Sequence, residues 1–466
     1  MAKLYIFGIG GTGSRVIKAL TMLFASGCQL ENGFDTVVPI IIDPDTGNGD
    51  LNRTKEILKL YQEIRKNIKN PDDFFAQELK TVTNLVTNAD SVNGDGFQFE
   101  LKGTAGSKFK EYIHYSNLDQ EDKYFVDQLY SHHNLESNLD VGFKGNPNMG
   151  SIVLNQFTTS KDFERFGQSF SPGDAIFIIN SIFGGTGAAG FPLLLKSLKN
   201  GAGIPNEALI KLADIGGITY LPYFKLNKGE IDSDTFLEKT KSAIDYYNRT
   251  IINQNQIEAL YLIGDIDTTS TYDNHSGQQE QKNDAHFLEL AGALAILDFT
   301  KNINNLTQGR IKIKEFGIDN NTKPLTFDSL NAQNAKQIES YLKKFRFYTE
   351  YLEKGLQRAL NVSRWTKKKT QLNKDYFDSS EYKNQIVKFN NHFRKWSQEL
   401  ENNKPSFAPF DKIIKNDDKG KQLFKYLDTA NCLAIDNAGT SEDKKHHQLI
   451  KLFSKSTQKV IQTHKL

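Results

Sequence analysis

The chain has 466 residues, of which 38% are hydrophobic and 24% charged, and its formal net charge is +2. This near balance excludes a strong overall field that would by itself favour nucleic acid, and we find no specific nucleic-acid signal. Two distant cysteines, Cys28 and Cys432, exclude a disulfide scaffold and a zinc ribbon. The apolar runs are too short to span a bilayer, and no apolar leader follows Met1. We therefore expect a cytoplasmic protein with no membrane span.

Residues 1–330 alternate short apolar strands with helices. The predicted strands are residues 4–7, 37–42, 174–180, 218–224 and 259–263, and the predicted helices are 14–24, 52–66, 191–198, 234–247 and 284–300. The last helix is apolar almost throughout and is therefore expected to be central. This alternation predicts an α/β fold with a helix-covered parallel sheet. The Asn-rich segment from about 46 to 141, which contains the helix 52–66, is interpreted as an insert.

The pattern changes after residue 330. Apolar residues recur every three or four positions over 338–360 and again over 386–400, which predicts amphipathic helices. We therefore expect two units, 1–330 and a helix-rich region 331–466. The run 367–369 is interpreted as solvated lysines.

Histidines are expected to have no metal-binding role. The adjacent pairs His132–His133 and His446–His447 have poor spacing for metal ligands and are predicted to lie on the solvated surface. His286, at the start of the central helix, is predicted to be buried and hydrogen-bonded, with stacking on a base as the alternative.

A first glycine loop follows the first strand and opens the helix 14–24. It consists of Gly8, Gly10, Gly11, Thr12 and Gly13 around Ile9. Glycines allow close approach of a phosphate to the backbone, and the N–H groups at a helix N-terminus point toward the anion. Alone, the loop is a weak signal for a phosphate site, with a tight structural turn as the alternative.

Two further observations bear on the first loop. Asp43, at the end of the second strand, would bind a ribose hydroxyl in a dinucleotide-binding fold. Neither of the chain's glycine loops is followed by Gly-Lys-Ser/Thr, which excludes a P-loop nucleotidase.

A second glycine loop has the same strand-to-helix context. Gly184, Gly185, Thr186 and Gly187 follow the strand 174–180 and open a helix. A dinucleotide-binding fold needs only one such loop, whereas two helix N-termini on one sheet can enclose a polyphosphate from both sides. The alternative is a glycine-rich packing turn.

The order of these motifs over residues 1–300 resembles the tubulin/FtsZ superfamily. Its signature is Gly-Gly-Gly-Thr-Gly-Ser/Thr-Gly after the fourth strand, and residues 184–187 match its middle. Phe183 replaces the first glycine, Ala188 the hydroxyl residue and Ala189 the last glycine, so one hydroxyl donor is missing. Residues 8–13 resemble the family's first phosphate loop.

Three other segments resemble parts of the family's site. Asp43 and Asp45 match the acidic segment near the metal and phosphates, and Asn146 lies in a loop similar to the one that senses the γ-phosphate. Asn283 and Asp284 match the pair that begins the base-reading turn in FtsZ, where a carboxylate accepts N1–H and N2–H of guanine.

The resemblance implies a divergent, bacterial tubulin-like protein that binds GTP or GDP. It implies a nucleotide-binding domain over 1–330 that includes the central helix. Mg²⁺ would be held through the phosphates, with Asp45 as the carboxylate closest to it and no direct protein ligation. The implied nucleotide-binding residues are Gly8, Gly10, Gly11, Thr12, Gly13, Asp43, Asp45, Asn146, Gly184, Gly185, Thr186, Gly187, Asn283 and Asp284.

The sequence departs from the family in three places. Residues 300–314, where the family has its catalytic loop, contain no carboxylate, and the nearest later candidates are Glu315 and Asp319. The insert 46–141 is long, and the C-terminal region is helical where the family has a helix-flanked sheet.

The implied function is head-to-tail self-association with slow GTP hydrolysis, and the C-terminal helices would offer a surface to a protein partner. Two alternatives stay open: an NAD-dependent enzyme, and a scaffold or adaptor whose tubulin-like core does not hydrolyse nucleotide.

Overall fold

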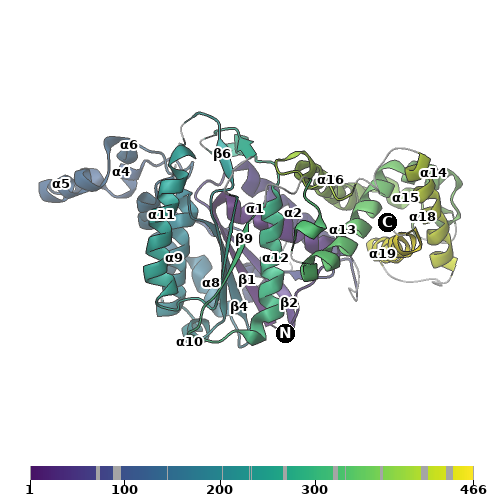
Figure 1. Ribbon diagram of the computed structural model, residues 1–466, viewed down its shortest axis with the longest axis horizontal. Coiled ribbons are helices and arrows are strands. Elements are labelled where there is room, and N and C mark those ends of the chain that lie inside the picture. Colours follow the sequence, from purple (N-terminus) through teal and green to yellow (C-terminus); the bar gives the residue numbers. More distant parts are fainter. Residues whose placement is uncertain are drawn as a thin grey trace.

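The computed structural model has three parts along its longest axis (Figure 1). An α/β body lies in the middle. An arm with α4 (Phe109–Tyr112), α5 (Gln120–Leu129) and α6 (His132–Leu135) projects from one side, and a helical unit lies on the other. The structure describes residues 2–69, 74–87, 96–143, 145–201, 203–229, 231, 233–265, 270–275, 277–317, 324–330, 332–367, 371–410, 418–436 and 444–464.

Seven parallel strands form the sheet of the body. Their order is β3-β2-β1-β4-β5-β7-β9. The bounds are β1 (Ala2–Ile9), β2 (Phe34–Ile42), β3 (Glu78–Leu79), β4 (Ala175–Ser181), β5 (Ile215–Tyr220), β7 (Ala259–Gly264) and β9 (Lys312–Gly317). The central strands are buried at nearly every residue, because helices cover both faces of a parallel sheet.

Two apolar cores lie on opposite faces of this sheet. Leu4 and Ile6 of β1 belong to one core, whereas Tyr5 and Phe7 belong to the other. The first core holds α1 (Gly10–Ala25), α2 (Gly49–Arg65) and α12 (Phe287–Asn302). The second holds α7 (Pro147–Leu154), α8 (Lys161–Ser169) and α9 (Gly185–Asn200), with α3 (Val82–Thr87), α10 (Glu207–Lys211) and α11 (Phe236–Tyr247) at its margin. The predicted α/β class is confirmed, and α12 is the buried central helix.

One strand prediction needs correction, and one strand of the sheet was not predicted. The predicted strand 218–224 is interrupted at Pro222, which has no N–H for a ladder; β5 ends at Tyr220, and β6 (Phe224–Leu226) pairs with β8 (Ser270–Tyr272) instead. Residues 300–314 are not only a loop, because they lead into the edge strand β9. Most of β9 is exposed, so it lacks the continuous apolar run that marks a buried strand.

The segment 46–141 is only partly an excursion. Its helix α2 packs on α1, β3 joins the sheet, and Phe97 and Phe99 are buried in the two cores. The part that leaves the body is the arm with α4, α5 and α6 (Figure 1).

The C-terminal region is helical, as predicted. The described helices are α13 (Ala332–Lys354), α14 (Leu356–Val362), α15 (Lys374–Asp378), α16 (Lys388–Asn402), α18 (Asp418–Asp436) and α19 (Lys445–His464). Aromatic rings join this unit to the body, because Phe345 and Phe389 contact Phe75, with ring centroids 5.6 and 5.0 Å away. No helix among the described residues is long and apolar enough to cross a membrane.

One histidine prediction is wrong. His132 and His133 are exposed, but His446 and His447 are buried in α19. Nδ1 of His446 lies 3.1 Å from the hydroxyl of Tyr376, and Nδ1 of His447 accepts a hydrogen bond from the backbone N–H of Lys69. The adjacent spacing gives no signal of burial, because both histidines are buried by contacts with residues that are distant in the sequence, Tyr376 and Lys69. His286 is buried, as predicted, and its Nδ1 caps α12 by accepting the N–H of Leu288, but its Nε2 has no hydrogen-bond partner among the described residues.

A cluster of buried charges connects the body to the helical unit. Arg15 of α1 donates to Glu289 of α12 at 2.5 Å and contacts Asp50 of α2 at 3.3 Å. Arg53 of α2 also contacts Asp50, at 2.9 Å, and donates to Glu399 of α16 at 2.5 Å. Four helices that are distant in the sequence therefore share one charge network.

Lys18 also belongs to this network, and its positive charge has the weakest pairing with a carboxylate. Its ammonium group is buried without a hydrogen-bond partner, 4.0 Å from Glu399 Oε2. Burial and the nearby Arg53 lower the pKa of Lys18. Burial opposes ionisation of Asp50, but Arg15, Lys18 and Arg53 together hold its pKa below the usual range. Glu399 thus compensates two buried cations.

We expect Glu399→Ala to destabilise the protein by about 3 kcal/mol, because it removes one partner of a buried ion pair and leaves Arg53 and Lys18 undercompensated. Urea unfolding followed by circular dichroism measures this loss. Gln398→Ala, at the neighbouring exposed position of α16, is the matched control and should change stability by less than about 0.5 kcal/mol. Equal stability of the two variants would show that the network does not hold α16 to the body.

Candidate functional site

The two glycine loops meet at the carboxyl edge of the sheet. β1 and β4 are neighbours in the ladder, and each is followed by a helix: α1 on one face and α9 on the other. A methyl group added at Gly10 would lie 3.6 Å from Cβ of Thr186 and 3.8 Å from the backbone N of Gly187. The chain therefore forms a topological switch point, where α/β proteins bind their ligands.

Two glycines of the first loop have a packing role. A methyl group on Gly13 would lie 2.4 Å from the carbonyl carbon of Gly8, so neither position has room for a side chain. Gly10 has a φ of +72°, which favours glycine. The close contact between Gly8 and Gly13 places the first turn of α1 directly against β1.

Both helices present unsatisfied N–H groups at this edge. α1 begins at Gly10, directly after β1, and α9 begins at Gly185. Neither helix has a side-chain cap or an acidic residue in its first turn. The free N–H groups and the positive ends of both helix dipoles thus converge, which is the arrangement that binds an anion such as a phosphate.

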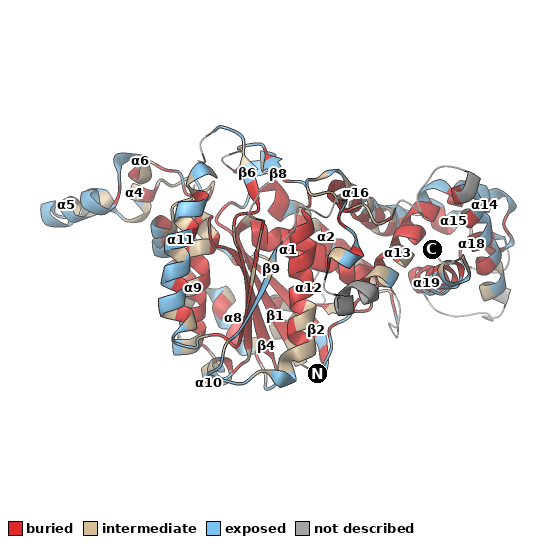
Figure 2. Ribbon diagram, viewed as in Figure 1, coloured by how far each residue is buried: buried red, intermediate tan, exposed pale blue. Residues whose placement is uncertain are grey.

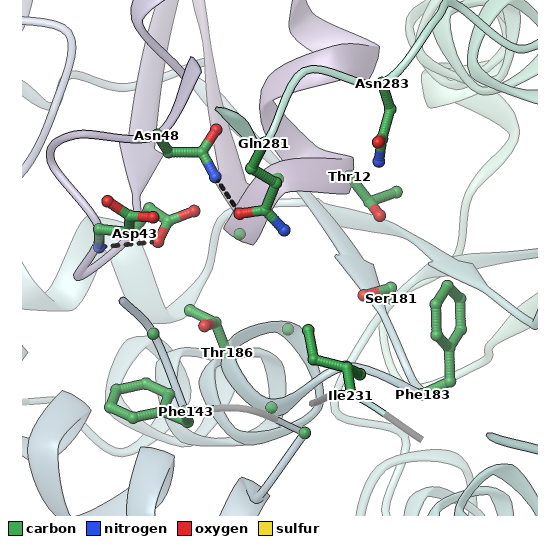
Figure 3. A pocket seen from close by; sticks show the side chains of 18 of the residues that line it. Thr12, Asp43, Asn48, Phe143, Ser181, Phe183, Thr186, Ile231, Gln281 and Asn283 are labelled. Atoms are coloured by element: carbon green, nitrogen blue, oxygen red, sulfur yellow. Dashed lines mark hydrogen bonds between the residues drawn. The ribbon is translucent and has the colours of Figure 1, made fainter. Parts of the chain in front are cut away.

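A cleft with about 940 Å³ of empty space, including solvent at its open side, lies over the two loops. Figure 3 shows Thr12, Ser181 and Thr186 around it, with Asp43 and Asn48 together on one side and Phe183 on the other. The described lining residues are Gly10, Gly11, Thr12, Arg15, Asp43, Asp45, Asn48, Val141, Gly142, Phe143, Gly145, Ser181, Phe183, Gly184, Gly185, Thr186, Gly187, Phe224, Leu226, Ile231, Phe236, Asp273, His275, Gln281 and Asn283. Such a space suits a small molecule.

Asp43 and Asp45 line the cleft in a tight turn after β2. Asp43 Oδ1 accepts the backbone N–H of Asp45, while the two oxygens of Asp45 accept the N–H groups of Gly47 and Gln278. Burial, with a further contribution from the charge of Asp45, raises the pKa of Asp43 to about 7. Burial also raises the pKa of Asp45. Asp43 therefore exchanges a proton near neutral pH.

The predicted base-reading pair is divided. Asn283 lines the cleft, and its backbone is fixed by the charge network, since its N–H donates to Asp50 and its carbonyl oxygen accepts from Arg53. Asp284 is exposed and is not among the lining residues. Asn146 is not a lining residue either, and its side chain caps α7 by accepting the N–H groups of Asn148 and Met149.

Positive charge is scarce in the cleft. Among the described lining residues the only Lys or Arg is Arg15, and its guanidinium is already paired with Glu289 and Asp50. The described residues contain no group of three or more His, Cys, Asp or Glu that could hold a metal ion. A divalent cation would therefore fit only if the ligand's phosphates supplied most of its coordination, with Asp43 and Asp45 beside it.

Of the two candidate catalytic carboxylates, the structure describes Glu315, and it does not line this cleft. Glu315 lies on the edge strand β9, where it lines a separate hollow against α12. The loop after α12 is about 24 Å from the cleft, the length of a sixteen-residue helix. Asp319 lies outside the described residues.

Several lining residues were missed by sequence reasoning. Asn48 caps α2, because its side chain accepts the N–H groups of Asp50 and Leu51. Asn is a preferred residue at a helix N-cap, so the sequence carried this signal. Its amide also donates to Gln281 at 2.5 Å (Figure 3). The apolar side has no local signal, since Phe183, Phe224 and Phe236 come from separate elements.

We expect Asp43→Asn to be more stable than the wild type by about 4 kcal/mol at pH 8, and the difference to vanish near pH 4. The unfolded chain releases this proton near pH 4, but the folded protein keeps it up to about pH 7. Wild-type stability is therefore lost as pH rises between these values. Asparagine keeps the acceptor for Asp45 and has no proton to lose.

Urea unfolding between pH 4 and 8 measures this difference, with exposed Asp35→Asn as the control. A difference between Asp43→Asn and the wild type that does not change with pH would contradict the raised pKa of Asp43.

Comparisons with known proteins give a remote structural likeness. No family model matches the chain, and no curated protein matches it. Among solved structures, CetZ from Methanosaeta thermophila strain DSM 6194 has 15% identity over 66% of this chain and a TM-score of 0.28. CetZ2 from Haloferax volcanii, in a GTPγS-bound protofilament, has 13% identity over 67% of this chain and a TM-score of 0.32. The chain covers 54% and 64% of the lengths of these proteins.

Proposed function

We propose that this chain is a tubulin-like protein that binds GTP or GDP in the cleft and self-associates. The proposal rests on one observation above all. A methyl group added at Gly10 of the first loop would lie within van der Waals distance of Thr186 of the second loop. Two helix N-termini this close address one polyphosphate. The motif order that resembles the tubulin/FtsZ superfamily supports guanine as the base.

The lining residues suggest an orientation for the nucleotide. The phosphates would lie over Gly11, Thr12 and Thr186, with the γ-phosphate and Mg²⁺ toward Asp43 and Asp45. The base would lie at the other side, against Phe183. Asn283 replaces Asp284 as the proposed base-reading residue, because its amide lines the cleft and can both accept from and donate to a purine edge.

Nucleotide binding is tested at Gly11. A methyl group there meets only Arg15 Nη1, at 3.4 Å, so the position is open enough to accept a side chain. We expect Gly11→Glu to weaken Mg²⁺-GTP binding at least a hundredfold, because a carboxylate would stand among the phosphates. Gly11→Ala is the matched control and should bind within about threefold of the wild type, since one methyl group leaves the N–H donors free.

Thermal-shift titration with Mg²⁺-GTP, Mg²⁺-ATP and NAD measures these affinities. Chromatography of the nucleotide released on denaturation identifies what copurifies. Released NAD, or stabilisation by NAD and not by GTP, would contradict the proposal and favour the dinucleotide-binding alternative.

Self-association would follow the direction of the central helix. The cleft lies at one end of α12, and the following loop lies at the other end with Lys301 and Arg310. A neighbouring copy stacked in this direction would place these cations near the bound phosphates, where they pair well with anions. Such a head-to-tail contact does not close on itself. Since residues 300–314 contain no carboxylate, the contact lacks a group to orient the attacking water.

We therefore expect GTP turnover slower than about 10⁻³ s⁻¹, the scale of an unassisted GTPase, even where light scattering shows assembly. Phosphate release measured against protein concentration tests this. Glu315→Gln and Asp319→Asn should leave the rate unchanged. Fast release that rises cooperatively with concentration and is lost in either variant would show that the missing carboxylate exists.

A further inference from the structure

The small net charge of the chain conceals two oppositely charged parts. Residues 331–466 contain 27 of the 58 Lys and Arg but only 15 of the 56 Asp and Glu, which gives this part +12 and residues 1–330 a charge of −10. Residues 354–374 contain seven basic residues and no acid, and residues 444–466 contain six lysines and no acid. Separation of charge on this scale favours association between oppositely charged surfaces.

The arm carries an unpartnered surface at one end of the molecule. None of the residues of α5 is buried, and Tyr124, Phe125 and Leu129 are 70%, 65% and 56% exposed. The neighbouring charged residues are mostly acidic. They are Asp119, Glu121, Asp122 and Asp127, with Lys123 as the one basic residue among 119–129. Neighbouring large apolar side chains on a projecting helix mark a contact surface rather than ordinary surface composition.

The helical unit offers the complementary surface, which we call the basic face. Lys421, Lys425 and Leu433 follow one exposed stripe of α18 at four- and eight-residue spacing, and Tyr426 lies beside them. Leu433 is 48% exposed and Tyr426 37%. The basic face thus combines apolar side chains with positive charge, as the arm combines them with negative charge.

The arm and the basic face lie at opposite ends of the longest axis (Figures 1 and 2). One copy cannot bring them together, but two copies can. We propose that α5 of one copy docks on the basic face of α18 of the next copy. Because two different surfaces meet, the contact is heterologous and can repeat without closing.

This contact differs in direction from the nucleotide-dependent one. The arm and the helical unit are separated across the strands of the sheet (Figure 1), whereas the cleft and the loop after α12 are separated along them. The proposed contact is therefore lateral and needs no nucleotide. It deepens, and rests on, the self-association part of the proposed function.

The short length of α5 limits the expected strength of the proposed contact. A helix of ten residues is about 15 Å long, so it buries less than a stable interface of about 1,600 Å² requires. We expect a weak contact that salt screens strongly. Nucleic acid is the competing occupant of the basic face, but it would leave the apolar residues of the arm unexplained.

Sedimentation velocity of the full chain without nucleotide tests the proposal, at about 50 mM and about 500 mM salt. We expect concentration-dependent association at low salt that weakens at least tenfold at high salt. Two variants reverse the charges: Glu121→Lys with Asp122→Lys on the arm, and Lys421→Glu with Lys425→Glu on the basic face. Each alone should be monomeric, and their equimolar mixture should associate again, because each arm then meets an opposite charge.

The control reverses Lys161 and Lys196, which are exposed on α8 and α9, and should associate as the wild type does. A monomeric wild type at low salt, or a mixture that stays monomeric, would overturn the proposal, as would binding of a DNA duplex to the basic face with no self-association. Thermal shift with Mg²⁺-GTP in the same variants should be unchanged. If neither the wild type nor the variants bind GTP but the wild type still associates, the proposed nucleotide site is contradicted. The proposed contact between α5 and the basic face would then still stand.

Discussion

The buried charge cluster under the first glycine loop ties α1, which presents that loop, to α2, α12 and α16. Arg15 belongs to the helix that presents the first loop, and its partners Glu289 and Asp50 belong to α12 and α2. Through Arg53 the same cluster reaches Glu399 in the C-terminal region. Buried ion pairs tolerate little displacement, because a buried charge whose partner moves away is left unpaired in the interior and destabilises the fold. The position of α1 and the docking of α16 are therefore coupled through a few side chains.

Much of the body was predictable, because its strands are buried on both faces. The strands predicted at 37–42 and 174–180 lie in β2 and β4, where continuous apolar runs are an unambiguous signal. The signal fails where one face meets solvent, as in β9, and where strand pairing is decided by distant residues, as in the two-residue β3. The buried histidines of α19 show the same limit, since His446 contacts Tyr376 and His447 contacts Lys69, and both partners are distant in the sequence.

The candidate site was predictable where it depends on the backbone. Glycines at a strand-to-helix junction indicate a helix N-terminus that faces a ligand, and both loops were found in this way. The structure separates their roles, since Gly8 and Gly13 pack the helix on the strand whereas Gly10 and Gly11 face the cleft. Side-chain contributions were less predictable. Gln281 and Phe224 reach the cleft through the tertiary fold, and Asp284 lies outside it although its neighbour Asn283 lines it.

Convergence of both glycine loops on one polyphosphate is tested most directly by an experimental structure of the protein with Mg²⁺ and GTPγS. The proposed function predicts phosphate oxygens within about 3 Å of backbone N atoms in both loops, from Gly10 to Gly13 and from Gly185 to Gly187. It also predicts a base beside Asn283. A ligand that touches only the first loop and extends its ribose toward Asp43 would contradict it.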